Sequence, residues 1–423
     1  MEVALGMRMD LQPLPILVFN GGSSSIKFSI YTADGAALTL LNYGEAAGIG
    51  TPKAQLSFYA FRDGERETLL SESAPSELRS TRDAVRKIAA LLQQPGLTRP
   101  TAIGHRIVHT GPKLNSHQLI TKEVLTEIEN ATCFAPLHQP IGLEIIREAK
   151  ESFPGVDNYA CFDTIFDQDL PEVASIYPLP KEIRDQGVHR YGFHGLSCES
   201  ILEQFQDGRV PFPSVSGKVP ERFIYAHLGS GASVTAIRKG RAMDVSMGLT
   251  PCGGILMGTR PGDLDPGLIF YLLRMHAGSA SNSTDAVEQL LNKRSGMLAL
   301  SGLSNDMRIL RDAANHGNQQ AALAIEAFVL SVKKMIGAYI ALMGGLDALV
   351  FSGGIGEHDP VTRAQVCAGM DAFGLTLNPV ENDPTHGGPK TVSQKGSKIA
   401  VYVLPADEDR VIAAHVARMA RER

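Results

Sequence analysis

The chain has 423 residues, of which 43% are hydrophobic and 20% charged, and its formal net charge is −5. This length exceeds what one hydrophobic core usually supports, so it predicts two domains. The ordinary composition indicates a globular protein. The lack of a basic excess argues against a nucleic-acid partner.

Cysteine usage and the N-terminus indicate the compartment. The five cysteines are scattered and include no CxxC pair, which argues against a disulfide framework and a zinc site and favours a reducing compartment. Residues 1–12 read as a short extension rather than a targeting signal. No sequence window approaches the ~20 apolar residues that span a membrane. We therefore expect a cytoplasmic protein that does not interact with membranes.

The first half opens with two strand-like runs, 16–20 and 26–31, joined by the Gly/Ser stretch that follows Asn20. Two strands joined in this way predict a hairpin, and the exposed N–H groups of its turn can surround an anion. The later predicted elements of this half are a helix at 76–93 with Ser76 as its N-cap, strands at 102–109 and 157–163, and a short helix at 141–150.

The second half repeats this construction. The run FIYAHLGSGASVTAIRKG at 223–240 predicts another hairpin with a Gly/Ser turn, and a third strand follows at 241–245. Further on we predict a helix at 317–343, a buried strand at 348–354 and a helix at 407–421 that begins with acidic residues. Each half thus begins with strands and continues with alternating helices and strands. This order predicts two α/β domains that face each other and hold phosphates between them.

Ten motifs match one known family along nearly the whole chain. In this order the chain resembles the acetate kinases of the acetokinase family, within the acetate and sugar kinase/Hsp70/actin superfamily. The motifs are NGGSSSIKF (20–28), GHRIVHTG (104–111), APLHQP (135–140), CFDTIF (161–166), RYGFHGLS (190–197), AHLGSGAS (226–233), SMGLTP (246–251), MGTRPGDLDPG (257–267), FSGGIGEH (351–358) and PADED (405–409).

The resemblance implies two duplicated ribonuclease H-like (actin-like ATPase) domains with the active site in the cleft between them. Residues 13–165 with the C-terminal helix 405–423 would bind the acid, and residues 166–404 would bind the nucleotide. The implied reaction is reversible phosphoryl transfer between ATP and acetate, giving ADP and acetyl phosphate, as a step of acetyl-CoA biosynthesis. The family uses Mg2+, for which Mn2+ can substitute, and is usually homodimeric.

Two arginines suit this chemistry. A kinase acting on a carboxylate brings two anions together, which requires cations at the acceptor and at the migrating phosphoryl group. Arg106 interrupts an apolar strand and Arg260 lies in a Gly/Pro-rich loop, where a surface salt bridge is a weaker explanation than a bidentate anion contact. By resemblance Arg106 binds the substrate carboxylate or its phosphate, and Arg260 stabilises the transferring group.

Asp163 and His194 complete the predicted catalytic set. Asp163 ends a strand-like run, where a carboxylate either faces a ligand crevice or caps the next turn. The resemblance favours catalysis, and because acetate is already ionised at neutral pH we expect positioning and electrostatics rather than general-base action. His194 lies in RYGFHG. A lone histidine is more often structural, but by resemblance it donates to the transferring phosphoryl oxygens.

The remaining site residues are implied by position in the family motifs. Asn20 and Glu408 match the Mg2+ positions, and oxygen ligands suit that ion, although Glu408 also suits a helix start. The predicted acid pocket consists of Val108, Leu137, Phe193 and Pro251, and nothing in it indicates an enlarged pocket. Glycines at 354–358 predict a loop against the nucleotide, or a tight turn before a helix at 360. ATP is expected to contact Lys27, His227, Leu228, Gly229, Ser230, Gly231, Asp306, Met307, Arg308, Gly354, Ile355, Gly356, Glu357 and His358.

Two residues depart from the family pattern, which usually has Asn where this chain has Ser230 and His358. Serine is a shorter donor, so it predicts a looser or water-bridged phosphate contact. One alternative is a propionate or butyrate kinase, which shares these motifs. Another is an actin- or chaperone-like switch driven by ATP. Two arginines beside a small-acid pocket favour a kinase over such a switch.

Overall fold

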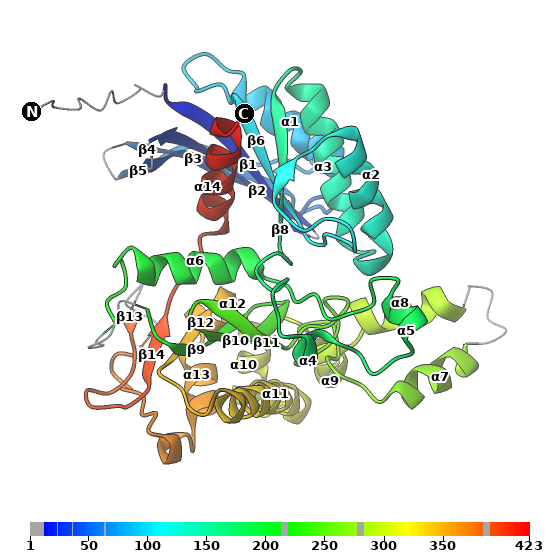
Figure 1. Ribbon diagram of the computed structural model, residues 1–423, viewed down its shortest axis with the longest axis vertical. Coiled ribbons are helices and arrows are strands. Elements are labelled where there is room, and N and C mark those ends of the chain that lie inside the picture. Colours follow the sequence, from blue (N-terminus) through cyan, green and yellow to red (C-terminus); the bar gives the residue numbers. More distant parts are fainter. Residues whose placement is uncertain are drawn as a thin grey trace, which may run out of the picture. The chain divides into compact units, whose positions relative to one another are not determined.

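The computed structural model describes residues 12–22, 24–35, 37–62, 65–212, 219–276, 283–383 and 390–423. It divides into two compact units, one comprising the residues up to Ile165 together with Asp407–Arg423 and the other Phe166–Ala406. Each unit is built on one mixed β-sheet (Figure 1). The extension predicted at 1–12 lies, except for its last residue, outside the described residues, and so does Ser23 of the first predicted turn.

The first unit contains an eight-stranded sheet in the order β5-β4-β3-β2-β1-β6-β8-β7. Its first five strands pair antiparallel in sequence order, which confirms the predicted opening hairpin. β6 is parallel to β1 and β8 is parallel to β6, whereas β7 is antiparallel to β8. The strands are β1 (Leu14–Gly21), β2 (Ser25–Asp34), β3 (Ala37–Ala47), β4 (Gln55–Arg62), β5 (Glu65–Ser73), β6 (Ala102–Ile107), β7 (Gln118–Leu119) and β8 (Asp157–Phe162).

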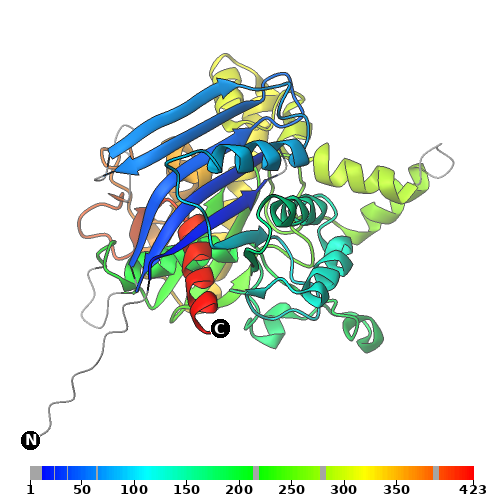
Figure 2. The same ribbon diagram turned by 90° about the horizontal axis from the view of Figure 1, so that it is seen from above.

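Helices cover both faces of this sheet. Leu17 of β1 and Ile103 of β6 are paired neighbours that face a core shared with α1 and α3. Gly104, the next residue of β6, faces α14 on the other side, because successive side chains of a strand alternate between the two faces. A Cβ on Gly104 would lie 2.5 Å from Ile412 Cγ2, so this glycine admits α14 against β6 (Figure 2). The predicted cap of α1 was wrong: Ser80, not Ser76, accepts from the Asp83 N–H. The helices are α1 (Thr81–Leu92), α2 (Lys122–Asn130), the 3-10 helix η1 (Ala131–Phe134), α3 (Gln139–Ser152) and α14 (Glu408–Arg421).

The second unit contains a six-stranded sheet in the order β11-β10-β9-β12-β14-β13. Its strand directions repeat those of β3-β2-β1-β6-β8-β7, with an antiparallel hairpin followed by two parallel strands and an antiparallel edge. The predicted duplicated α/β fold is therefore confirmed. The strands are β9 (Arg222–Leu228), β10 (Ala232–Arg238), β11 (Arg241–Val245), β12 (Ala348–Ser352), β13 (Lys390–Thr391) and β14 (Ala400–Val403).

In the second unit α6 packs on the sheet through Ile201 and Phe205, and the long helix α11 confirms the helix predicted near 317–343. The glycine loop predicted at 354–358 was wrong, because these residues form α12, which starts at Gly353 with a φ of 76°. The helices are α4 (Glu172–Ser175), α5 (Lys181–Arg184), α6 (Gly195–Gln206), α7 (Pro266–Met275), α8 (Ser283–Lys293), α9 (Gly296–Ser301), α10 (Met307–Asn315), α11 (Gln319–Met343), α12 (Gly353–His358), α13 (Pro360–Cys367) and the 3-10 helix η2 (Asp371–Phe373). Among the described residues no helix is both long and apolar enough to cross a membrane.

Candidate active site

A charged cluster in the first unit gathers four residues predicted for the site. Asn20 lies near the end of β1, Arg106 near the end of β6, and Asp163 directly after β8. These three strands are parallel neighbours, so their carboxyl ends meet at one edge of the sheet, where ligands usually bind in α/β folds. Glu408, the first residue of α14, completes this arrangement, which we call the Arg106 cluster.

Arg106 is held by acids in this cluster. Its Nη2 donates to Asp163 Oδ2 at 2.5 Å, and its Nε lies 3.5 Å from Glu408 Oε2. Burial alone would lower the pKa of Arg106, but the charges of Asp163 and Glu408 outweigh burial and raise it. The guanidinium therefore stays charged, and any anion that binds here shares it with Asp163.

Asp409 belongs to the same cluster although it was not predicted. The Asn20 Nδ2 donates to Glu408 Oε2 at 2.9 Å and to Asp409 Oδ1 at 3.1 Å, and Ser29 Oγ donates to Asp409 Oδ2 at 2.8 Å. Burial raises the pKa of Asp409 to about 6. The run Asp407-Glu408-Asp409 was the available signal, but it also reads as an ordinary acidic helix start. Carboxylate and amide oxygens together are the donor set that Mg2+ prefers, so these side chains fit that ion.

A second group of predicted residues lies in the second unit around the β9–β10 turn. His194 adopts a left-handed backbone conformation at the start of α6, and its Nδ1 lies 2.9 Å from Ser233 Oγ. Its ring stacks on that of His227 with centroids 4.1 Å apart. A Cβ on Gly231 would lie 2.8 Å from Arg260 Nη2 and 3.8 Å from His194 Nε2, so both side chains reach this turn.

Arg260 differs from Arg106 in its partners. Its Nη1 donates to the Pro251 carbonyl at 2.5 Å, and within the described part of the chain it forms no ion pair. Burial lowers the pKa of Arg260, since nearby carboxylates do not compensate for lost hydration. A half-buried guanidinium without a carboxylate partner suits an incoming oxyanion.

A pocket of about 640 Å³ lies beside this turn in the second unit. Its lining includes residues of α12 and the residues that precede and begin α10. Eight residues predicted to bind ATP line it: Gly229, Ser230, Asp306, Met307, Arg308, Gly354, Ile355 and His358. Three further lining residues were not predicted, namely Asn305, Arg311 and Asp359. Each is adjacent to a residue predicted to bind ATP or one helical turn from it, and this proximity was the available signal in the sequence. We call this cavity the α12 pocket.

The other residues predicted to bind ATP do not line the α12 pocket. Lys27 is exposed on β2 of the first unit, opposite Asn20 in the pairing of β1 with β2. Glu357 Oε1 accepts from the Gly353 N–H at 2.9 Å, so this side chain bonds to the first residue of its own helix. The remaining members of this set are His227 and Gly231 at the β9–β10 turn, the buried Leu228, and the buried Gly356 in α12.

The predicted acid pocket draws on both units. Val108 follows Arg106 by two residues, and Leu137 precedes α3, so both belong to the first unit. Phe193, which is buried, precedes His194, and the carbonyl of Pro251 holds Arg260; both belong to the second unit. Their contact with a substrate acid stays a prediction.

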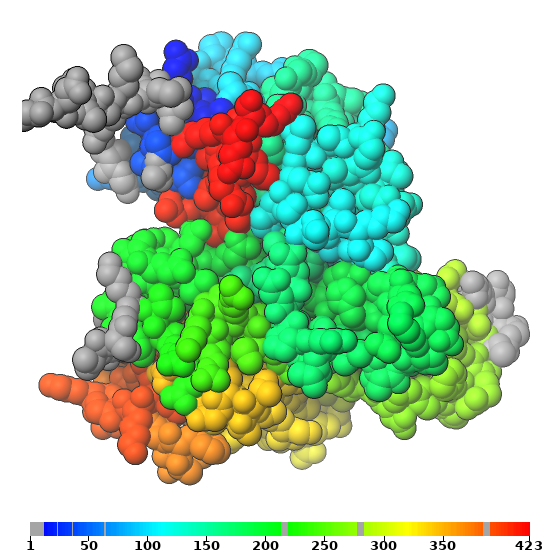
Figure 3. All heavy atoms as spheres, viewed as in Figure 1, coloured from blue at the N-terminus to red at the C-terminus, as the bar shows by residue number. Residues whose placement is uncertain are grey.

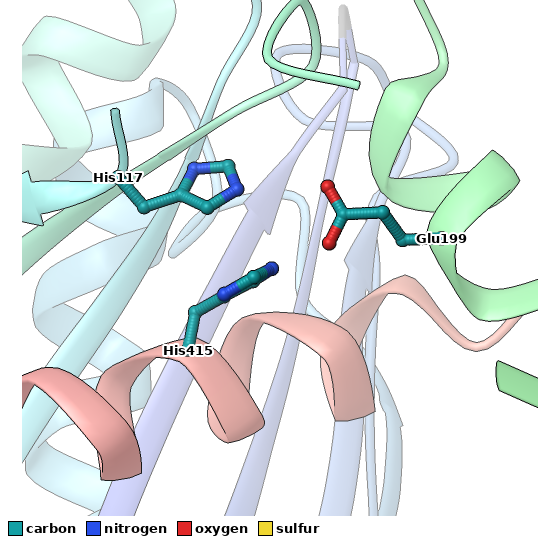
Figure 4. A group of neighbouring side chains, drawn as sticks. All are labelled: His117, Glu199 and His415. Carbon is teal, nitrogen blue, oxygen red and sulfur yellow. The ribbon is translucent and has the colours of Figure 1, made fainter. Parts of the chain in front are cut away.

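Two histidines of the first unit, His117 and His415, lie with ring centroids 4.1 Å apart (Figure 4). The Nδ1 of His117 accepts from the Phe162 N–H at 3.0 Å, and the Nδ1 of His415 accepts from Arg418 at 3.1 Å. Each neutral ring therefore carries its proton on Nε2. A metal ion would bind Nε2 of either ring only by displacing this proton.

The same sheet topology used twice in one chain is the actin-like fold, and a nucleotide-sized pocket beside an arginine without a carboxylate partner is typical of a phosphotransferase built on it. The chain belongs to the acetokinase family, whose profile matches residues 15–414.

Similar proteins include the acetate kinase of Rhodopseudomonas palustris strain CGA009, 39% identical over 96% of this chain and 98% of that protein. The acetate kinase of Geobacillus kaustophilus is 38% identical over 96% of this chain and 99% of that protein. The crystal structure of Porphyromonas gingivalis acetate kinase has a TM-score of 0.78 at 34% identity, covering 96% of this chain and 100% of that one. A propionate kinase structure from Francisella tularensis has a TM-score of 0.82 at 31% identity over the same shares.

Proposed function

We propose that this protein is an ATP:acetate phosphotransferase that reversibly converts ATP and acetate into ADP and acetyl phosphate. The observation that carries this proposal is Arg260, a guanidinium without an ion-pair partner among the described residues, beside a Gly/Ser turn that borders the α12 pocket. Membership of the acetokinase family and the similarity to acetate kinases over nearly full length support the choice of substrate.

In the second unit the nucleotide would occupy the α12 pocket. Its phosphates would extend toward Ser230 and Gly231, where small residues allow the backbone N–H groups to approach oxygen atoms closely. Arg260 and His194 would donate to the oxygens of the transferring phosphoryl group. The Ser233 contact with Nδ1 fixes the orientation of the His194 ring for this task.

In the first unit Arg106 would bind the acid or acyl phosphate, and Asp163 would hold its guanidinium in place. Asn20, Glu408 and Asp409 would hold Mg2+, for which Mn2+ can substitute, and the ion would neutralise charge on the nucleotide phosphates. Asp163 would act by position and charge, because the acceptor carboxylate already lacks its proton at neutral pH.

The family resemblance also supports four broader proposals, on the domains, the compartment, the pathway and the oligomeric state. Residues 13–165 with 405–423 would form the acid-binding domain, and residues 166–404 the nucleotide-binding domain. The enzyme would work in the cytoplasm, in acetyl-CoA biosynthesis, as a homodimer.

A propionate kinase is the second candidate function, favoured by the similarity to the Francisella tularensis structure. The four residues of the predicted acid pocket are apolar and none is unusually small. An extra methylene that must be squeezed into a filled pocket costs ~1–3 kcal/mol. We therefore expect propionate to react more slowly than acetate and butyrate to be poor.

An acyl-hydroxamate assay with ATP, Mg2+ and each of acetate, propionate and butyrate tests both candidates. Acetate should give the highest kcat/KM, and Arg260→Ala should lower the rate with every acid that reacts. Butyrate at or above acetate would contradict the acetate assignment. No acid-dependent product with any of the three acids would contradict the kinase itself and leave an ATP-driven switch.

A further inference from the structure

The His117 ring contacts the backbone at the end of β8, the strand that leads into Asp163. β7 pairs with β8 at Tyr159 and Ala160, so this pairing stops two residues short of Phe162. Beyond that point the His117 side chain takes the place of a neighbouring strand, because its Nδ1 accepts from the Phe162 N–H at 3.0 Å. Phe162 is fully buried, and a buried backbone N–H requires such an acceptor. His117, which directly precedes β7, therefore extends the hydrogen bonding of β8 to its last residue.

Asp163 is fixed by backbone bonds on both sides of this strand end. β8 lies between β6 and β7 in the sheet. On the β6 side the Asp163 N–H donates to the Ile107 carbonyl at 2.9 Å, and on the β7 side His117 holds the preceding residue. From this position the Asp163 carboxylate accepts from Arg106 Nη2 at 2.5 Å. Loss of the His117 bond would leave one side of the strand end unsupported, next to the acid that orients Arg106.

His117 is itself held by α14. Its ring and that of His415 lie with centroids 4.1 Å apart, and Arg418 donates to the His415 Nδ1 at 3.1 Å (Figure 4). In the space-filling view the red atoms of α14 lie against cyan atoms of the first unit (Figure 3). α14 begins with Glu408, whose Oε2 lies 3.5 Å from Arg106 Nε. The two histidines therefore connect the helix that carries one acid partner of Arg106 to the strand that carries the other.

We propose that His117 is a positioning residue for phosphoryl transfer, which acts through the Phe162 N–H to hold Asp163 where it orients Arg106. This inference rests on the proposed role of Arg106 in binding the acid or acyl phosphate. Small displacements matter at such a site, since a shift of about 1 Å can lower a rate ~10²-fold. The nucleotide would bind in the α12 pocket of the second unit, so the loss of His117 should affect the acid and leave ATP binding unchanged.

Steady-state kinetics of the full chain with acetate, ATP and Mg2+ test this role. His117→Leu keeps a side chain of similar size and removes the acceptor. It should raise KM for acetate and lower kcat/KM for acetate at least ~10-fold, with KM for ATP unchanged. His117→Asn places an amide oxygen near the position of Nδ1, so it should restore most of the parental activity. A variant that was merely less stable would lower kcat through a smaller folded fraction and leave both KM values unchanged.

Ser80→Ala is the matched control, because Ser80 also accepts from a backbone N–H of the first unit, that of Asp83 at 3.1 Å. This bond caps α1, and its loss should leave KM for acetate at the parental value. Hydrogen exchange followed by mass spectrometry supplies a readout that does not require activity. The peptide that contains β8 and Asp163 should exchange faster in His117→Leu than in the parent or in His117→Asn.

Three results would overturn the proposal. The first is an unchanged KM for acetate in His117→Leu, and the second is a His117→Asn variant that is as impaired as His117→Leu. The third is unchanged exchange of the β8 peptide in His117→Leu. A parent protein without acid-dependent product would contradict the proposed function itself, and the exchange experiment would still test the contact of His117 with β8.

Discussion

The fully buried Arg363 allows a quantitative prediction about α12. Its Nη1 donates to the carbonyls of Gly356 and Glu357 at 2.8 and 2.9 Å, and its Nε and Nη2 donate to the side chain and backbone of Asn382 at 2.7 and 2.8 Å. The first two acceptors belong to the last turn of α12, where carbonyls lack intrahelical partners. Burial lowers the pKa of Arg363, and the charge of Asp359 offsets this effect only in part.

Replacing this side chain with methionine keeps much of its volume and removes all four donated bonds. An unsatisfied buried acceptor costs ~1–3 kcal/mol, but water and local movement will satisfy some of the four. We expect Arg363→Met to lower the free energy of unfolding by about 4 kcal/mol. Because Gly354, Ile355 and His358 of the same helix line the α12 pocket, the variant should also bind ADP at least ~10-fold more weakly.

Urea unfolding and calorimetric titration with ADP measure the two effects. Arg79→Met is the control. The Arg79 side chain is 75% exposed and forms a surface ion pair with Asp83, so its loss should change stability by less than about 1 kcal/mol. An Arg363→Met variant as stable as this control would refute the reasoning on buried carbonyls. A destabilised variant that keeps its ADP affinity would refute the role of Arg363 in positioning α12.

Three further predictions concern activity and pH. Arg260→Ala should lower kcat by ~10²–10³ with the fold intact, because it removes a donor to the transferring group; near-parental kinetics with acetate, ATP and Mg2+ would contradict that role. Val108→Ala should narrow the kcat/KM gap between acetate and propionate by up to ~10-fold by making room, and an unchanged ratio would place Val108 outside the acid pocket. Burial lowers the pKa of His105 to about 4, below its unfolded value, so the stabilising effect of the neutral ring is complete above about pH 6.5 and is lost as pH falls toward 4. The stability difference between the parent and His105→Gln should therefore shrink by roughly 3 kcal/mol over this range, as urea unfolding at several pH values would show. The raised pKa of Asp409 acts in the opposite direction but cancels in that difference, and a pH-independent difference would contradict the assignment to His105.

The two hairpins could be predicted because their turns carry Gly and Ser between alternating strands, and both formed as β1–β2 and β9–β10. The strands β3, β4 and β5 were missed, and for β5 the reason is the opposite one. The sequence of β5, ERETLLSES, is polar and exposed on both faces, so it lacks the alternation that marks a strand. Backbone pairing to β4 holds it in the sheet, and such pairing leaves no trace in the side-chain pattern.

The candidate site likewise contains residues that the sequence predicted and one that it did not. The second Gly/Ser turn and the glycines of α12 predicted a ligand site where the α12 pocket lies, because small residues allow the backbone to approach a ligand closely. Asp409 was missed because its role depends on Ser29 and Asn20, which lie nearly the whole chain away. No local pattern records a contact at that sequence separation.

The duplicated sheet also explains why the two units carry different chemistry at equivalent positions. In each unit the functional residues follow the first hairpin strand and the parallel strands beside it, at the carboxyl edge where the topology leaves room for a ligand. In the first unit that edge holds Arg106 and its acids, so it is charged and largely filled. In the second unit β12 runs into Gly353 and Gly354 instead, and these small residues leave the α12 pocket open. The fold thus determines where ligands can bind, and the residues after each strand decide which kind of ligand suits that place.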